Sequence, residues 1–173
     1  MSAAADATPL TTRRRLAILV LFATAMGWLE AVVVVYIRGL LGIARHDTIP
    51  AAGEVMRRLA ALPWLLPTEQ TREAATLLML ATVAVLSATT FRSRFGAFLV
   101  LFGTWDIVYY VGLYALLRWP PSLMTMDLLF LLPPHPWWYQ PVWVPVLVSC
   151  VMIGLGLRLY LRAPRSGRLS RPM

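Results

Sequence analysis

Two acidic side chains, Glu30 and Asp106, lie inside apolar segments that are long enough to cross a membrane. A carboxylate in hydrocarbon is costly, and such groups usually face the interior of a helix bundle or a water-filled cavity. Tyr109 and Tyr110 follow Asp106 at positions i+3 and i+4, so in a helix they lie on the same face as Asp106. Carboxylates and phenols grouped in this way can bind a cation, or can donate and accept protons.

The depth of these acids can be compared by counting residues along each segment. Glu30 lies 14 residues after Leu16, which is roughly 21 Å of helix, and Asp106 lies 11 residues after Phe95, roughly 16 Å. Because the first segment enters from the same side as the third, both acids fall in the same half of the bilayer. We therefore expect one pocket, open to the outside and built around Glu30, Asp106, Tyr109 and Tyr110.

Further ionisable side chains fall at the same end of the expected bundle. We expect Arg38, Arg72 and Glu73 to balance charge, and Asp127 and His135 to lie at the mouth of the pocket. Each has a structural alternative, since Glu73 could serve a helix N-terminus, Asp127 and His135 could face solvent, and Glu30 could simply pair with Arg38 or Arg72.

No cofactor and no catalytic residue can be assigned from the sequence. Carboxylates and a histidine are ligand types that suit several metals, and a metal bound here would be held by Glu30 and Asp106. The Glu-x-x-His, HExxH and glycine-rich phosphate-binding motifs are missing, however. Cys150 is the only cysteine, which excludes a disulfide or a thiolate zinc cluster within one chain.

The composition indicates a membrane protein. Of the 173 residues 59% are hydrophobic and 14% are charged, against roughly 45–50% and about 25% in a soluble domain. Four segments have the length of a spanning helix, at residues 16–36, 74–90, 95–117 and 141–160. The first continues without a break past the apolar length of a signal peptide, so we expect it to be retained. The predicted fold is all-α, with four transmembrane helices in one bundle.

The distribution of arginine predicts the orientation. The net charge is +8, and every basic residue is an arginine that flanks an apolar segment. This pattern follows the positive-inside rule and differs from the basic, aromatic face of a nucleic-acid-binding protein, so we expect no nucleic-acid partner. The basic link FRSRF between the second and third segments belongs on the cytoplasmic side, which places both termini there.

The outer side is expected to carry two short interfacial or re-entrant helices. Residues 51–62 place apolar side chains on one face and Glu54, Arg57 and Arg58 on the other. Residues 122–132 are too few to span a membrane, and PPHPWWYQPVW follows them as an aromatic belt. The transmembrane domain is expected at residues 13–162, between a disordered tail at 1–12 and a basic disordered tail at 163–173.

The segments GWLEAVVVVYIR, TREAATLLML, FGTWDIVYYVGLYALL and MDLLFLLPPHPWWYQPVWVPV carry a resemblance to a known group. They resemble small four-helix inner-membrane proteins of bacteria that have no assigned activity, over residues 27–148. The resemblance implies a location in the bacterial inner (cytoplasmic) membrane and no particular reaction.

Two classes of function fit these observations. In the first, the pocket binds a cation or a lipophilic small molecule, as part of a transporter or of a membrane-embedded enzyme. In the second, the protein is a non-catalytic structural or assembly subunit, its ion pairs hold the helices in register, and its partners are a larger membrane complex or further copies of itself. Both classes share the lipid bilayer as a partner.

Overall fold

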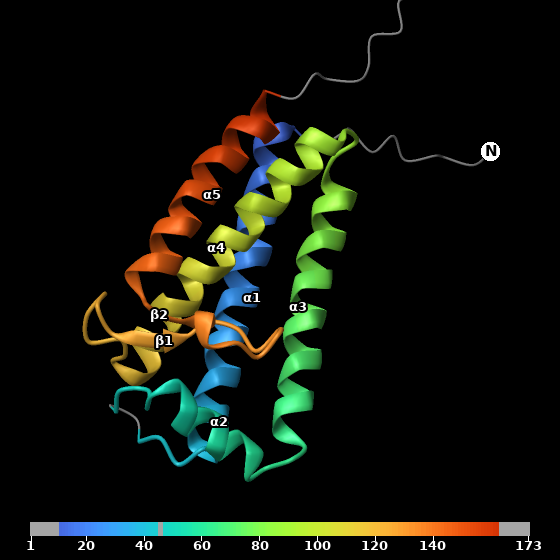
Figure 1. The fold of residues 1–173 in the computed structure, drawn as a ribbon. Helices are drawn as coiled ribbons and strands as arrows, with labels where there is room; N and C mark the ends of the chain where they lie inside the picture. Colours follow the sequence, from blue (N-terminus) through green and yellow to red (C-terminus); the bar gives the residue numbers. More distant parts are fainter. Residues whose placement is uncertain (1–10, 45–46, 163–173) are drawn as a thin grey trace, which may run out of the picture.

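The computed structural model describes residues 11–44 and 47–162 of the chain, and these residues are mainly helical (Figure 1). The α-helices are α1 (Thr12–Leu40), α2 (Ala52–Ala60), α3 (Leu65–Ser87), α4 (Phe91–Leu117) and α5 (Trp143–Leu161). Two short strands, β1 (Met126–Leu128) and β2 (Tyr139–Pro141), form an antiparallel hairpin before α5. A single 3₁₀ turn, η1 (Pro136–Trp138), precedes β2. The predicted helical bundle is therefore present, together with a hairpin that was not predicted.

The four long helices run side by side in alternating directions (Figure 1). The first residues of α1, the last residues of α5 and the link between α3 and α4 lie at one end of the bundle. Helix α2 and the hairpin lie toward the opposite end, which we call the hairpin end. The short link between α3 and α4, residues 88–90, makes these two helices antiparallel, whereas the longer connections at residues 41–64 and 118–142 contain α2 and the hairpin.

Three of the helices, α1, α4 and α5, are long and apolar enough to cross a membrane. Their outward faces carry many exposed apolar side chains, such as Leu21, Val111 and Val151. Helix α3 has the length of a span, but Glu69, Arg72 and Glu73 occupy its first half. It also begins at Leu65 rather than at residue 74, because TEQTRE continues the helix instead of forming a loop.

Helix α1 begins inside the N-terminal tail that was predicted at residues 1–12. The Thr11 side chain caps α1 by accepting a hydrogen bond from the backbone of Arg14, and Thr12 is the first helical residue. The rest of that tail and the whole predicted C-terminal tail fall outside the described residues. Thr90 and Ser93 form a reciprocal capping box that starts α4 after a very short link.

Glycines allow α4 to pack closely against both α1 and α5. A Cβ atom at Gly96 would lie 2.7 Å from the backbone nitrogen of Tyr160, and one at Gly156 would lie 2.7 Å from the carbonyl oxygen of Gly96. Gly27 of α1 similarly abuts the backbone of α4. Gly154 differs from Gly156, since nothing lies within 4 Å of a Cβ placed there, so it is not part of the close contact.

The predicted helix at residues 122–132 is wrong. Met126–Leu128 instead pair with Tyr139–Pro141, so that Asp127 faces Gln140 across the hairpin. The residues between the strands, 129–138, form a tongue that reaches across to α3 (Figure 1). The backbone of Leu131 at its tip is bonded by side chains of α3, and these long-range partners favour an extended chain over a local helix.

The predicted short helix at residues 51–62 is present as α2. Val55 and Leu59 are buried against Leu41, Ile43 and the tongue residue Leu131, and Glu54 pairs with Arg57 and Arg58 on the other side. Helix α2 and the tongue together cover the hairpin end of the bundle.

The close packing of α4 and α5 gives a test with a matched control. Replacing Gly96 with Ala should lower the free energy of unfolding by about 1–3 kcal/mol, since the new methyl group meets backbone atoms that cannot move aside. Gly154→Ala should be neutral or stabilising by up to about 1 kcal/mol, because alanine favours the helix and the space is open. Thermal denaturation in detergent micelles measures both variants, and equal effects would contradict the packing described.

Candidate functional site

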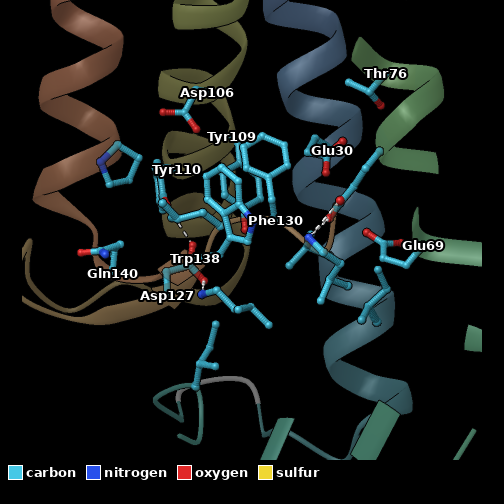
Figure 2. Close-up of a pocket in the computed structure, with 18 of the residues that line it drawn as sticks. Glu30, Glu69, Thr76, Asp106, Tyr109, Tyr110, Asp127, Phe130, Trp138 and Gln140 are labelled. Carbon is cyan, nitrogen blue, oxygen red and sulfur yellow. Dashed lines mark hydrogen bonds between the residues drawn. The ribbon is translucent and has the colours of Figure 1, made fainter. Parts of the chain in front are cut away.

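A cavity of about 660 Å³ lies in the hairpin half of the bundle and is lined by α1, α3, α4, α5, the hairpin and the tongue (Figure 2). Its volume is within the roughly 300–1,000 Å³ of small-molecule sites. Helix α3 touches α1 little. The apolar cluster that α1 and α3 share, with Leu19, Ala23, Leu80 and Ala84, lies in the opposite half of the bundle, and the cavity occupies the hairpin half.

Eight of the nine residues expected at the pocket line this cavity. They are Glu30 and Arg38 of α1, Arg72 and Glu73 of α3, Asp106, Tyr109 and Tyr110 of α4, and Asp127 of β1. His135 is placed elsewhere, in a shallow hollow with Pro133, Trp137 and Trp138. Its Nδ1 accepts a hydrogen bond from the backbone of Trp137 at 3.1 Å, so it caps η1, and it does not line the cavity.

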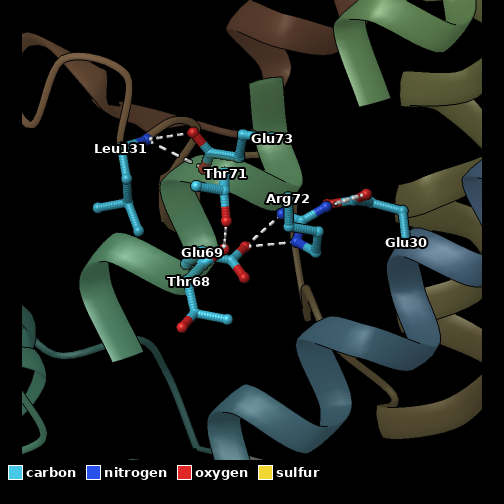
Figure 3. A network of polar contacts seen from close by, with 7 residues as sticks. All are labelled: Glu30, Thr68, Glu69, Thr71, Arg72, Glu73 and Leu131. Atoms are coloured by element: carbon cyan, nitrogen blue, oxygen red, sulfur yellow. Dashed lines mark hydrogen bonds and ion pairs between the residues drawn. The ribbon is translucent and has the colours of Figure 1, made fainter. Parts of the chain in front are cut away.

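Arg72 joins α3 to α1 through two carboxylates (Figure 3). Its guanidinium group bonds Glu30 of α1 and, one turn away on its own helix, Glu69. Of the two partners considered for Glu30, the structure therefore has Arg72. Glu69 is a cavity residue that the sequence analysis missed, although its position three residues before Arg72 on one helix face was a usable signal.

Glu73 holds the tongue. Both of its carboxylate oxygens accept the backbone N–H of Leu131, at 3.1 and 3.0 Å (Figure 3). Gln70, one turn earlier, donates to the carbonyl oxygen of the same residue at 2.9 Å. Glu73 is thus neither a helix cap nor bonded to Arg72, and within the described residues its side chain bonds the tongue backbone rather than a cation.

Arg38 is buried and only partly bonded. Its Nη2 donates to the backbone carbonyl of Asp47 at 2.6 Å, and its guanidinium carbon lies 4.9 Å from the centre of the Trp119 ring. Its Nε and Nη1 have no hydrogen-bond partner among the described residues. Arg38 therefore contributes a positive charge at the cavity wall without an ion pair.

Asp127 is the most deeply buried acid, with 2% of its surface exposed. The Tyr110 hydroxyl donates to it at 2.9 Å and the backbone N–H of Leu128 donates at 2.8 Å. Burial raises the pKa of Asp127 to about 6, and the bond from Tyr110 and the charge of Arg38 only partly oppose this rise. Asp127 therefore carries its charge near neutral pH and loses it in mildly acidic solution.

Asp106 has a neutral partner. The Ser149 hydroxyl of α5 donates to it at 2.8 Å. Helix α5 carries no acid, but its residues Val148, Ser149 and Met152 line the cavity, so it is part of the site. Next to Asp106 on α4, the ring of Tyr109 packs edge-on against Tyr110, with 4.9 Å between ring centres. No hydrogen bond of the Tyr109 hydroxyl is found within residues 11–44 and 47–162.

The remaining lining is largely aromatic and aliphatic. Phe130 of the tongue lies 6.4 Å from both Phe102 and Trp105 of α4, and 5.2 Å from Trp138, between ring centres. These rings form one wall of the cavity, and the acids lie around it (Figure 2). Aromatic faces attract cations, and they also accommodate apolar groups.

The charges around the cavity are unequal. Five carboxylates line it, Glu30, Glu69, Glu73, Asp106 and Asp127, against the two guanidinium groups of Arg38 and Arg72. Arg72 already bonds two of the acids, which leaves Glu73, Asp106 and Asp127 without an ion pair in the described part of the chain. Within that part, no three His, Cys, Asp or Glu side chains are grouped so that they could hold a metal ion.

Comparison with known proteins adds no assignment: no family model, curated protein or solved structure matches the chain.

Removing Arg72 should destabilise the protein strongly. Arg72→Gln leaves Glu30 and Glu69 as adjacent buried carboxylates, and losing one partner of a buried ion pair costs about 3–5 kcal/mol. The triple variant that also carries Glu30→Gln and Glu69→Gln should recover part of this loss, because no uncompensated charge remains. Arg57→Gln is the control, since that side chain is 80% exposed, and should change stability little. Chemical denaturation measures all three, and a triple variant less stable than Arg72→Gln would contradict the network.

Proposed function

We propose that the protein is an inner-membrane protein of bacterial type in which α3 is the fourth span and both termini are cytoplasmic. Two features support the proposal. Basic residues gather at the end of the bundle opposite the hairpin, at Arg13–Arg15, Arg92, Arg94 and Arg158. The charged residues Glu69, Arg72 and Glu73 of α3 all line the cavity, so they face protein rather than lipid. The cavity then lies in the outer half of the bilayer.

In this cavity, we propose, the protein binds a small organic cation that carries apolar groups. The observation that supports this most directly is the excess of carboxylates over guanidinium groups around one aromatic-lined space. A cation there gains from the charge of Asp106 and Asp127, and the rings of Trp105, Tyr109 and Phe130 supply apolar contact and cation–π attraction. Arg72 does not repel it strongly, because its charge is already compensated by Glu30 and Glu69.

Both a transport component and a membrane-embedded enzyme would need to bind such a cation. A transport component needs a charged site reached from one side of the membrane, and the cavity at the hairpin end supplies it. A membrane-embedded enzyme needs an acid that changes protonation near neutral pH beside a polar partner, and Asp127 with Tyr110 supplies that pair. Cation binding is therefore the step to test first.

Tetraphenylphosphonium, a rigid lipophilic cation, is a suitable probe for protein reconstituted in lipid nanodiscs. Calorimetric titration, corrected with empty nanodiscs, should show saturable binding to the wild type. Asp106→Asn and Asp127→Asn should each weaken it about tenfold, which corresponds to about 1.4 kcal/mol of lost attraction. Asparagine can keep the bonds to Ser149 and Tyr110, so the fold should survive both changes.

Glu54→Gln is the matched control, because Glu54 is an acid of α2 that does not line the cavity. It should leave the affinity for tetraphenylphosphonium unchanged. Equal affinity for the wild type and both aspartate variants would refute the proposed function.

Binding should also depend on pH. The raised pKa of Asp127, about 6, means that this carboxyl is mostly charged at pH 7.5 and mostly neutral at pH 5. Affinity for the cation should therefore fall as the pH is lowered, with a midpoint near 6, and Asp127→Asn should reduce this dependence. Measuring the dissociation constant from pH 5 to pH 8 tests this, and affinity that rises toward pH 5 would rule out a charged Asp127 as a binding group.

The alternative, a non-catalytic structural or assembly subunit, is favoured by one observation. The most strongly bonded charges of the cavity, Glu30, Arg72 and Glu69, hold two helices together and need no ligand to explain them. This alternative predicts that the purified protein binds no cation and that a stoichiometric partner chain accompanies it from native membranes.

A further inference from the structure

The side of the bundle between α3 and α5 lacks a helix. Helix α4 packs against α1, α3 and α5, whereas α3 and α5 are not packed against one another. The tongue crosses this side in the hairpin half, from the hairpin to α3 (Figure 1). It is attached to α3 through Leu131 and to α4 through the rings around Phe130. The cavity is therefore closed toward this side by a loop and by side chains of α5, rather than by a packed helix.

Val148 marks a place where the cavity reaches the outer surface of the bundle. It lines the cavity and is also 50% exposed. Val144 and Met152, one turn to either side on α5, line the cavity too. The neighbouring surface of α5 carries Leu147, Val151 and Leu155, all exposed and apolar. Val148 lies five residues into a helix that is apolar enough to span a membrane, at a depth of roughly 8 Å.

The two regions of the cavity differ in chemistry. The acids Asp106 and Asp127 lie inside it, and Ser149 of α5 bonds the first of them. The other α5 residues beside Val148 that line the cavity, Val144 and Met152, are apolar. A ligand that matches both regions has a cationic group and an apolar chain. An opening toward hydrocarbon suits such a ligand, because the chain can stay in lipid while the charged group enters the cavity.

We propose that the ligand is a single-chain amphiphilic cation, such as an amine- or ammonium-headed lipid. Its cationic group lies near Asp106 and Asp127, and its chain leaves the cavity between α3 and α5, past Val148, into the outer leaflet. This inference rests on the proposed function, cation binding in the same cavity, and adds the class of ligand and its path.

Dodecyltrimethylammonium and tetraphenylphosphonium separate this inference from the proposal on which it rests. Both are cations, but only the first has a long chain. Titrations in nanodiscs at a fixed lipid-to-protein ratio should show both binding to the wild type. Val148→Trp should weaken dodecyltrimethylammonium binding at least tenfold by filling the exit between α3 and α5. Because Val148 also lines the cavity, tetraphenylphosphonium binding should weaken too, but clearly less than dodecyltrimethylammonium binding.

Val151→Trp is the matched control. Val151 is one turn further along α5, is 61% exposed, and does not line the cavity. It should leave the binding of both cations unchanged. If Val148→Trp does not accumulate in membranes, Val148→Phe replaces it and should give the same selective loss.

The outcomes are distinguishable. Tetraphenylphosphonium that fails to bind the wild type would overturn the proposed function, and this inference with it. Normal binding of tetraphenylphosphonium, together with equal affinities of the Val148 and Val151 variants for dodecyltrimethylammonium, would overturn only the chain path. Loss of both cations in the Val148 variant would also overturn it, since the site would then lack a separate exit for a chain.

Discussion

The structure of the cavity depends on the way Arg72 is shared between Glu30 and Glu69. Helix α3 touches α1 little, and these charges bridge the two helices in the hairpin half of the bundle, away from the apolar cluster that the helices share. Apolar packing at this level would have brought the helices together and filled the space. An arginine with long reach and several donors can instead hold two elements apart and still compensate buried carboxylates. At the level of the cavity, α1 and α3 are therefore joined by ion pairs rather than by apolar packing, and this leaves the space between them open.

The other helices are held by a different interaction. Gly27, Gly96, Gly103 and Gly156 let α1, α4 and α5 approach until backbone and side-chain atoms are in contact. Such packing is rigid, because any added side chain meets atoms that cannot move away. A tightly packed group of three helices therefore carries Asp106, Tyr109 and Tyr110 in fixed positions. The more loosely packed α3 and the tongue complete the site.

The acids of the cavity differ in what compensates them, and this decides what they can do. Glu30 is bonded to a cation, Glu73 to a backbone amide, Asp106 to a hydroxyl and Asp127 to a phenol and an amide. Only the first is neutralised by a positive charge. Neutral donors orient a carboxylate but leave its charge in place, so the field of the remaining acids is available to a ligand.

The sequence by itself determined the four long helices, their order and the helix faces that carry Glu30, Asp106 and the tyrosines, because hydrophobic length and helical spacing are local properties. It also placed these acids at one end of the bundle by counting residues. Only the tertiary structure decided that Arg72 rather than Arg38 pairs with Glu30, that Ser149 bonds Asp106, and that residues 122–132 form a strand and part of a tongue. Each of these depends on a partner from a distant segment, and no spacing along the chain specifies which distant group will satisfy a buried charge or a free backbone amide.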